Sequence, residues 1–154
     1  MRVIVVVVGK ARHPALGAAA RGYEERAARY WPLEVRHVRQ EMGADQPSAR
    51  ALGREGMRII EAAGARSTIV ACDATGKRMT SVEFAQWLQG ERESARDICF
   101  AIGGAHGLSR DVLGAAQFKL SLAPWTLAHE LARLVLAEQL YRAGTIVRRE
   151  PYNK

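Results

Sequence analysis

A glycine-rich turn follows a short apolar run and is able to bind a small molecule through its backbone. The run covers residues 97–102 and leads into Gly103, Gly104 and Gly107. Glycine lets a chain turn tightly and lets a ligand approach the backbone without a side chain in between. In an open α/β sheet, ligands bind beyond the carboxyl ends of the strands. The turn is therefore a candidate pocket wall, although a plain strand-to-helix connection would use the same glycines.

Two other apolar runs also end in turn-forming residues. Residues 67–72 end at Cys72 and lead into the turn-rich stretch 73–77, while residues 118–123 stop at Pro124. If these strands are neighbours in one sheet, the three following loops meet in a single crevice. Three converging strand ends indicate a small-molecule site more strongly than one glycine cluster does.

Titratable side chains form two helical pairs. His129 and Arg133 are four residues apart, as are Glu138 and Arg142, so each pair shares one helix face. Such pairs suit proton transfer or charge stabilisation, and they are equally typical of ordinary ion pairs. The sequence has no dinucleotide-binding, P-loop or nucleophile-elbow motif. Its histidines and cysteines lack metal-ligand spacing, so we expect no metal site.

Alternating strands and helices would position these groups. β-Branched or alternating runs predict strands at residues 3–8, 33–39, 67–72, 97–102 and 118–123, the second of them near a sheet edge. Helical periodicity predicts helices at residues 14–30, 48–63, 81–88, 109–116 and 126–143. Ser48 is expected to cap one of these helices and Thr80 or Ser81 the next, while Gly64 and Gly144 are expected to end two. We expect an α/β fold with a mostly parallel sheet flanked by helices, in a single domain spanning residues 1–154.

The composition narrows the class of protein further. A chain of 154 residues with a formal charge of +7 suits a polyanionic partner such as nucleic acid, although an arginine-rich proteome would give the same balance. Cys72 and Cys99 lie in apolar runs and are expected to be buried thiols. No run is long enough for a membrane span, and the first apolar run lacks the long apolar region and the cleavage site expected of a signal peptide. We therefore expect a cytoplasmic protein with no membrane partner, and we expect loop structure at residues 43–47.

Three stretches together resemble a family within the SPOUT class, the ribosomal RNA large-subunit methyltransferase H family. They read IGGAHGLS at residues 102–109, LSLAPWTLAH at 120–129 and LVLAEQLYRA at 134–143. The resemblance extends over nearly the whole chain and includes the valine-rich start, Glu55-Gly56 and Asp73-x-x-Gly76-Lys77. It implies a C-terminal trefoil knot, a homodimer whose sites are each completed near the partner, and S-adenosylmethionine as methyl donor. The implied acceptor is N3 of a pseudouridine in 23S rRNA within the assembled ribosome.

The resemblance also assigns roles to individual residues. The donor would contact Cys72, Gly103, Leu122, Ala123, Pro124, Trp125, Thr126 and Leu127. Because the acceptor N3–H must lose its proton, a cation such as Arg142 would stabilise the deprotonated base. Tyr152 would hydrogen-bond to the base or stack on it. His129 and Glu138 are further candidates for the general base. The apolar face of residues 127–140 would serve either as a dimer seam or as internal packing.

The C-terminal tail departs from the family pattern. It reads Glu150-Pro151-Tyr152-Asn153-Lys154, so the two histidines typical of the family tail are absent and another group must take their part. The basic residues expected to hold RNA are Lys10, Arg12, Arg148, Arg149 and Lys154. The altered tail leaves open a non-catalytic protein that binds ribosomal RNA or assists ribosome assembly. An enzyme for another nucleotide-like ligand is a further alternative, which the missing phosphate motifs disfavour.

Overall fold

The computed structural model describes residues 1–41 and 48–153, so the predicted loop at 43–47 and Lys154 lie outside the described residues. Five strands form one parallel sheet in the order β2-β1-β4-β3-β5. They are β1 (Val3–Val8), β2 (Leu33–Val38), β3 (Ser67–Arg78), β4 (Asp97–Ile102) and β5 (Phe118–Ser121). The predicted α/β class is confirmed. Because β4, β3 and β5 are adjacent, the turn after β4, the segment after β5 and the stretch after Cys72 lie at one edge of the sheet.

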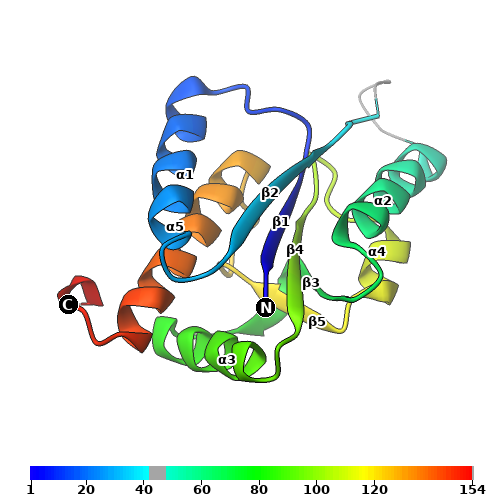
Figure 1. The fold of residues 1–154 in the computed structure, drawn as a ribbon. Coiled ribbons are helices and arrows are strands. Elements are labelled where there is room, and N and C mark those ends of the chain that lie inside the picture. Colours follow the sequence, from blue (N-terminus) through cyan, green and yellow to red (C-terminus); the bar gives the residue numbers. More distant parts are fainter. Residues whose placement is uncertain (42–47, 154) are drawn as a thin grey trace.

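Helices cover both faces of the sheet (Figure 1). One face carries α1 (Pro14–Ala27), α3 (Ser81–Glu93) and α5 (His129–Val147), and the other carries α2 (Ala49–Ala63) and α4 (Arg110–Ala115). Alternate valines of β1 therefore pack in two different cores, Val5 beside Trp31 and Val6 beside Ile59. This explains why the whole run is β-branched and apolar. None of the described helices combines the length and apolarity needed to cross a membrane.

Local end signals place two helices as predicted. The Ser48 hydroxyl accepts a hydrogen bond from Ala51 N at 3.2 Å, and Gly64 ends α2 with φ +83°. At the start of α3, Thr80 and Glu83 form a reciprocal capping box. These contacts satisfy backbone groups that a helix end leaves without partners.

The prediction for α5 is wrong at both ends. The helix begins at His129 rather than Thr126, because residues 122–128 form an irregular segment after β5. It also runs past Gly144, which was expected to end it, and continues to Val147. A Cβ on Gly144 would lie 2.6 Å from Tyr30 Cβ, so glycine there permits close packing of Tyr30 on the helix. Tertiary packing, and not a helix end, accounts for this glycine.

The chain does not leave the sheet permanently after Cys72, contrary to the predicted loop at 73–77. Cys72 and Lys77 both pair with Leu120 of β5, so residues 73–76 bulge out and the strand then resumes. The Asp73 carboxylate accepts a hydrogen bond from Thr75 N at 2.8 Å, which turns the chain locally. A Cβ on Gly76 would lie 2.7 Å from backbone atoms of Lys119 and Leu120. Only glycine allows the strand to return this close to β5.

A buried ion pair joins α1 to α5. Arg133 donates two hydrogen bonds to the Glu24 carboxylate, at 2.7 and 2.9 Å, and about nine-tenths of each side chain is buried. The pair predicted from spacing, His129 with Arg133, is therefore not the one that Arg133 makes. Bidentate geometry offsets much of the cost of removing both charges from water.

We expect Arg133→Ala to lower the free energy of unfolding by about 3–5 kcal/mol, because it leaves the Glu24 carboxylate buried without its partner. The exposed pair of Arg2 and Asp97 supplies the control, and Arg2→Ala should cost less than about 1 kcal/mol. Urea unfolding followed by circular dichroism measures both values. Equal losses for the two variants would contradict the role given to the buried pair.

Candidate active site

A cavity of about 450 Å³ opens beside the bulge in β3 and beyond the carboxyl ends of β4 and β5. Its volume suits a ligand the size of a nucleoside or a small cofactor. The three loops predicted to converge do form its walls. The cavity is lined by seven of the eight residues expected to contact a donor, namely Cys72, Gly103, Leu122, Ala123, Trp125, Thr126 and Leu127. Pro124 is exposed and does not line it.

The turn after β4 has a shape that requires glycine. Gly107 N donates to Gly104 O at 3.1 Å, and Gly107 has φ +78°. A Cβ on Gly103 would lie 2.8 Å from Leu108 N and closer still to the Gly107 carbonyl. The chain therefore folds back on itself directly beside the cavity. His106 is exposed at the tip of the turn and does not line the cavity.

Among the described residues that line it, the cavity has a negative side chain and no permanently positive one. Asp73 lines it, and hydrogen bonds from Thr75 hold the pKa of that carboxyl below its usual range. None of the described lining residues is lysine or arginine. Burial raises the pKa of the Cys72 thiol to about 12, so at neutral pH it is not a thiolate nucleophile. This charge pattern suits a neutral or cationic ligand better than a phosphate.

A second cluster gathers around Glu138 near the end of α5. Arg142 donates to Glu138 Oε1 from Nε at 3.0 Å and from Nη2 at 2.6 Å, and the Tyr152 hydroxyl donates to the same oxygen at 3.2 Å. The Arg142 guanidinium lies 4.9 Å from the centre of the Tyr152 ring. The hydrogen bond to Glu138 raises the pKa of Arg142, so it stays cationic. The structure thus brings together both predicted catalytic residues, Arg142 and Tyr152.

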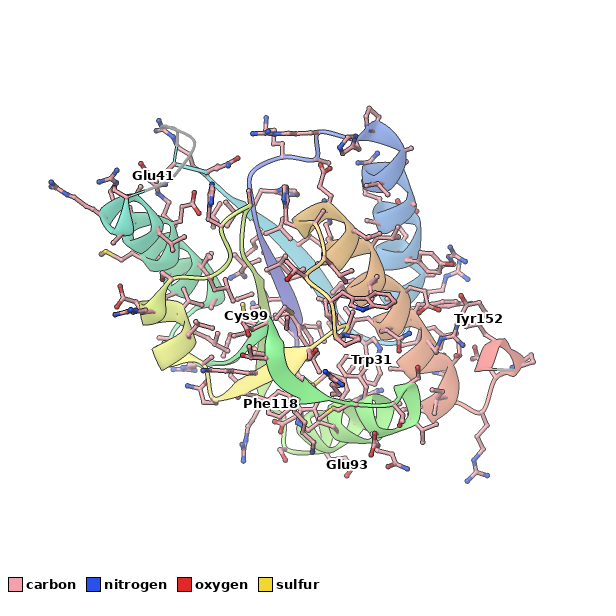
Figure 2. The ribbon with its side chains drawn as sticks, turned by 180° about the vertical axis from the view of Figure 1, so that it is seen from behind. Trp31, Glu41, Glu93, Cys99, Phe118 and Tyr152 are labelled. Atoms are coloured by element: carbon pink, nitrogen blue, oxygen red, sulfur yellow. The ribbon has the colours of Figure 1, made fainter. Side chains whose placement is uncertain are left out.

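These two residues lie far from the cavity within one chain. With a rise of about 1.5 Å per residue, α5 separates His129, in the cavity wall, from Arg142 by about 20 Å. Figure 1 shows α5 starting near the carboxyl ends of the strands and ending near their amino ends, where the chain terminates. Figure 2 shows Tyr152 beside this last part of α5. Of the two general-base candidates, His129 lies at the cavity and Glu138 lies in the distant cluster.

The outward face of α5 connects the two regions. At about 100° per residue, Leu131, Leu134, Val135, Glu138 and Arg142 fall on one stripe. Leu131 is 37% exposed, and Trp125 beside the start of the helix is 75% exposed. The opposite face, with Leu136 and Leu140, is buried inside the domain. The helix therefore has the internal packing that was one expectation, and it also leaves apolar residues on its outer face.

Several contacts at these sites have no signal in the sequence. Glu130 is buried and accepts hydrogen bonds from the backbone N–H groups of Arg12 and His13, which ties the basic loop after β1 to the start of α5. All four tyrosines gather at the other end of α5: Tyr23, Tyr30, Tyr141 and Tyr152. In the part of the chain that the structure describes, no three metal-ligating side chains are grouped to hold an ion.

Comparison with known proteins places this chain in a family. A family profile described as "Predicted SPOUT methyltransferase" matches residues 1–153. The protein of Gemmatimonas aurantiaca called ribosomal RNA large subunit methyltransferase H is 53% identical over the full length of both chains. A protein of the same name from Anaeromyxobacter sp. (strain Fw109-5) is 43% identical, again over both full lengths.

Among solved structures, the SpoU methyltransferase AviRb from Streptomyces viridochromogenes, in complex with the cofactor AdoMet, matches with a TM-score of 0.43. It is 16% identical, and the match covers 97% of this chain and 58% of that one. The family profile and the full-length relatives confirm the resemblance read from the sequence. The chain belongs to the SPOUT methyltransferases, in the family of ribosomal RNA large subunit methyltransferase H.

Proposed function

We propose that this protein transfers a methyl group from S-adenosylmethionine to N3 of a pseudouridine in 23S rRNA of the assembled large ribosomal subunit. The acting unit would be a cytoplasmic homodimer. The observation that carries the proposal is the cavity beside the bulge in β3 and the carboxyl ends of β4 and β5, whose walls include seven predicted donor contacts. The names of the full-length relatives support ribosomal RNA as the substrate. The trefoil knot stays a prediction.

The residues around the cavity fit the donor. A turn in which Gly103 has no room for a side chain exposes backbone groups to a ligand. The ionised Asp73 carboxylate, with no lysine or arginine in the described lining, favours a ligand that carries positive charge. When bound, S-adenosylmethionine supplies a methyl group already activated by its sulfonium. The protein then needs chiefly to align the acceptor and to help its N3 proton leave.

A dimer would bring the two separated halves of the site together. A two-fold axis makes the same surface face itself. If the outward stripe of α5 packs antiparallel against its copy, the end with Glu138 and Arg142 meets the end with Leu131 and Trp125. That arrangement covers the exposed apolar residues and carries the partner's Arg142 and Tyr152 toward the cavity. Arg142 would stabilise the deprotonated base, while the neutral Tyr152 phenol would hydrogen-bond to it or stack on it.

Basic residues near both ends of α5 would contact the RNA. Lys10 and Arg12 are exposed in the loop after β1, which Glu130 fixes to the start of α5. Arg149 is exposed just before the tail. Contacts of this kind to phosphates make binding strongly dependent on salt. The formal charge of +7 supports the same interpretation.

The test is nucleoside mass spectrometry of 23S rRNA from cells with and without the gene. We expect N3-methylpseudouridine to disappear without the gene and to return with the wild-type chain. In a purified assay on large subunits, Arg142→Ala should reduce turnover about 100-fold, because it removes a cation that stabilises developing negative charge. Tyr152→Phe should also reduce turnover, and neither variant should change donor affinity.

The exposed Arg66, outside both clusters, supplies the matched control, and Arg66→Ala should keep wild-type turnover. An unchanged nucleoside profile on deletion would refute the proposed activity. Calorimetry that detects no donor binding at millimolar concentration would favour a non-catalytic RNA-binding protein instead. Wild-type turnover in both Arg142→Ala and Tyr152→Phe would overturn the roles given to those residues.

A further inference from the structure

The chain reverses direction immediately after α5 through a residue that is not glycine. Glu150 N donates to Thr145 O at 2.8 Å, and Arg149 N donates to Ile146 O at 3.0 Å. This is the hydrogen-bond pattern of a Schellman motif, in which glycine usually takes the left-handed position. Here Arg149 occupies it with φ +58°. Because a left-handed conformation is unfavourable for arginine, other contacts must hold the reversal in place.

Tyr30 provides such a contact from the segment between α1 and β2. Its ring lies against Gly144 of α5, where no side chain intervenes, and the Arg148 guanidinium lies 4.8 Å from the ring centre. Its hydroxyl donates a hydrogen bond to the Glu150 carboxylate. The ring is thus fixed by packing on both sides, and its hydroxyl presents a fixed donor to the first residue after the reversal.

The reversal determines where Tyr152 lies. Residues Pro151–Asn153 form a short 3-10 turn that starts directly after Glu150. Two residues beyond the anchor, the Tyr152 ring packs on Tyr141 with ring centres 4.6 Å apart. Its hydroxyl reaches the same Glu138 oxygen that Arg142 contacts. A shift at Glu150 would therefore move Tyr152 away from Arg142 and Glu138.

We propose that Glu150 and Tyr30 are positioning residues, whose hydrogen bond fixes the C-terminal tail on α5 and so holds Tyr152 in register with Arg142. Neither residue lines the cavity, and the pair would act through Tyr152. This inference rests on the proposed methyl transfer for its catalytic consequence. The contact itself can be measured without any activity.

The contact has a spectroscopic signature. The hydrogen bond to Glu150, together with burial and the nearby negative charge, raises the pKa of Tyr30 to about 12. Loss of the carboxylate should return this value toward the usual value of about 10. We therefore follow tyrosine ionisation by ultraviolet absorbance in the wild type, Glu150→Ala, Glu150→Gln and Tyr30→Phe. The Tyr30→Phe spectrum identifies which transition belongs to Tyr30.

The same four proteins are assayed for methyl transfer to large ribosomal subunits. We expect Glu150→Ala and Tyr30→Phe each to lower kcat about tenfold, because a small displacement of an aligned group slows a reaction steeply. Donor affinity and the thermal midpoint should stay unchanged, and the double variant should be no slower than either single one. Glu150→Gln should keep most of the activity, because its amide oxygen still accepts from Tyr30. Glu25→Ala, an exposed glutamate on α1, is the control for loss of charge and should be fully active.

Each outcome decides the proposal. A Tyr30 transition that stays near 12 in Glu150→Ala would show that the contact is not present. A transition that moves while kcat is unchanged would show a contact without a positioning role. A fall in the thermal midpoint that accounts for the lost activity, or an inactive Glu150→Gln, would also overturn it. If the wild-type protein methylates no ribosomal RNA, the proposed function fails while the titration still reports on the contact.

Discussion

Replacing Gly103 by alanine should abolish binding of S-adenosylmethionine. The added Cβ would lie 2.8 Å from Leu108 N and would collide with the Gly107 carbonyl, both of which are backbone groups that no rotamer change can move. The turn would have to open, and the opening would shift the wall formed by Gly104, Gly107 and Leu108. Isothermal titration calorimetry with the donor measures the loss.

Gly114→Ala is the matched control for this substitution. Gly114 lies exposed within α4, and a Cβ there would meet no atom within 4 Å. Alanine also favours the helix, so this variant should be as stable as the wild type and should bind the donor equally well. Circular dichroism should show that the Gly103→Ala chain retains its secondary structure. Wild-type affinity in Gly103→Ala would mean that the donor does not bind against this turn.

Two inactive variants should restore activity to each other when mixed. Gly103→Ala disables the donor half of a site, and Arg142→Ala disables the half contributed by the end of α5. If each site combines one half from each chain, a mixed dimer contains one intact site and one doubly altered site. With free exchange of subunits and equal amounts of the two chains, activity should recover to about a quarter of the wild-type value. Methyl transfer to large subunits, assayed after the chains have exchanged, measures the recovery.

The control for this experiment is a mixture in which both substitutions affect the same half. Arg142 and Tyr152 belong to the same half of a site. In a mixture of Arg142→Ala and Tyr152→Phe, every such half therefore lacks one of the two side chains, and activity should stay at the level of the single variants. Failure of Gly103→Ala and Arg142→Ala to complement each other, once exchange has been verified by mass spectrometry, would place Arg142 and the cavity of the same chain in one site. Such a result would require a large rearrangement to close the separation of about 20 Å along α5, which the close packing of α1 against α5 does not favour.

Much of the fold could be predicted because local patterns and burial agree. The valine run of β1 suits only a strand covered on both faces, and the structure buries all six residues. The bulge after Cys72 could not be predicted, because Asp73 and Gly76 have the turn chemistry of an ordinary loop. Only the pairing of Lys77 with Leu120, far along the chain, returns this segment to the sheet. The prediction that Gly144 ends α5 was wrong for the same reason, since Tyr30, which packs against this glycine, is more than a hundred residues away in the sequence.

The candidate site likewise has one part that could be predicted from the sequence and one part that could not. The cavity walls at Cys72, Gly103 and Leu122 followed from one rule, that loops at the carboxyl ends of adjacent parallel strands meet. The contacts that hold the other half, such as Tyr30 with Glu150, join residues 120 positions apart. No periodicity or motif in the sequence links such residues. Their pairing depends on how α1 and α5 pack, which becomes visible only in three dimensions.

The helix α5 has a consequence for how this protein can evolve. Its inner face fills the core with Leu136 and Leu140, and its side toward α1 holds the buried Arg133. Its outer face carries Glu138 and Arg142, and its two ends border the cavity and the tail. Few of its positions are free to drift neutrally, because a change on any side disturbs either folding or chemistry. Substitutions among descendants of this chain should therefore be most frequent on the outer surfaces of α2 and α3, where they affect neither folding nor chemistry.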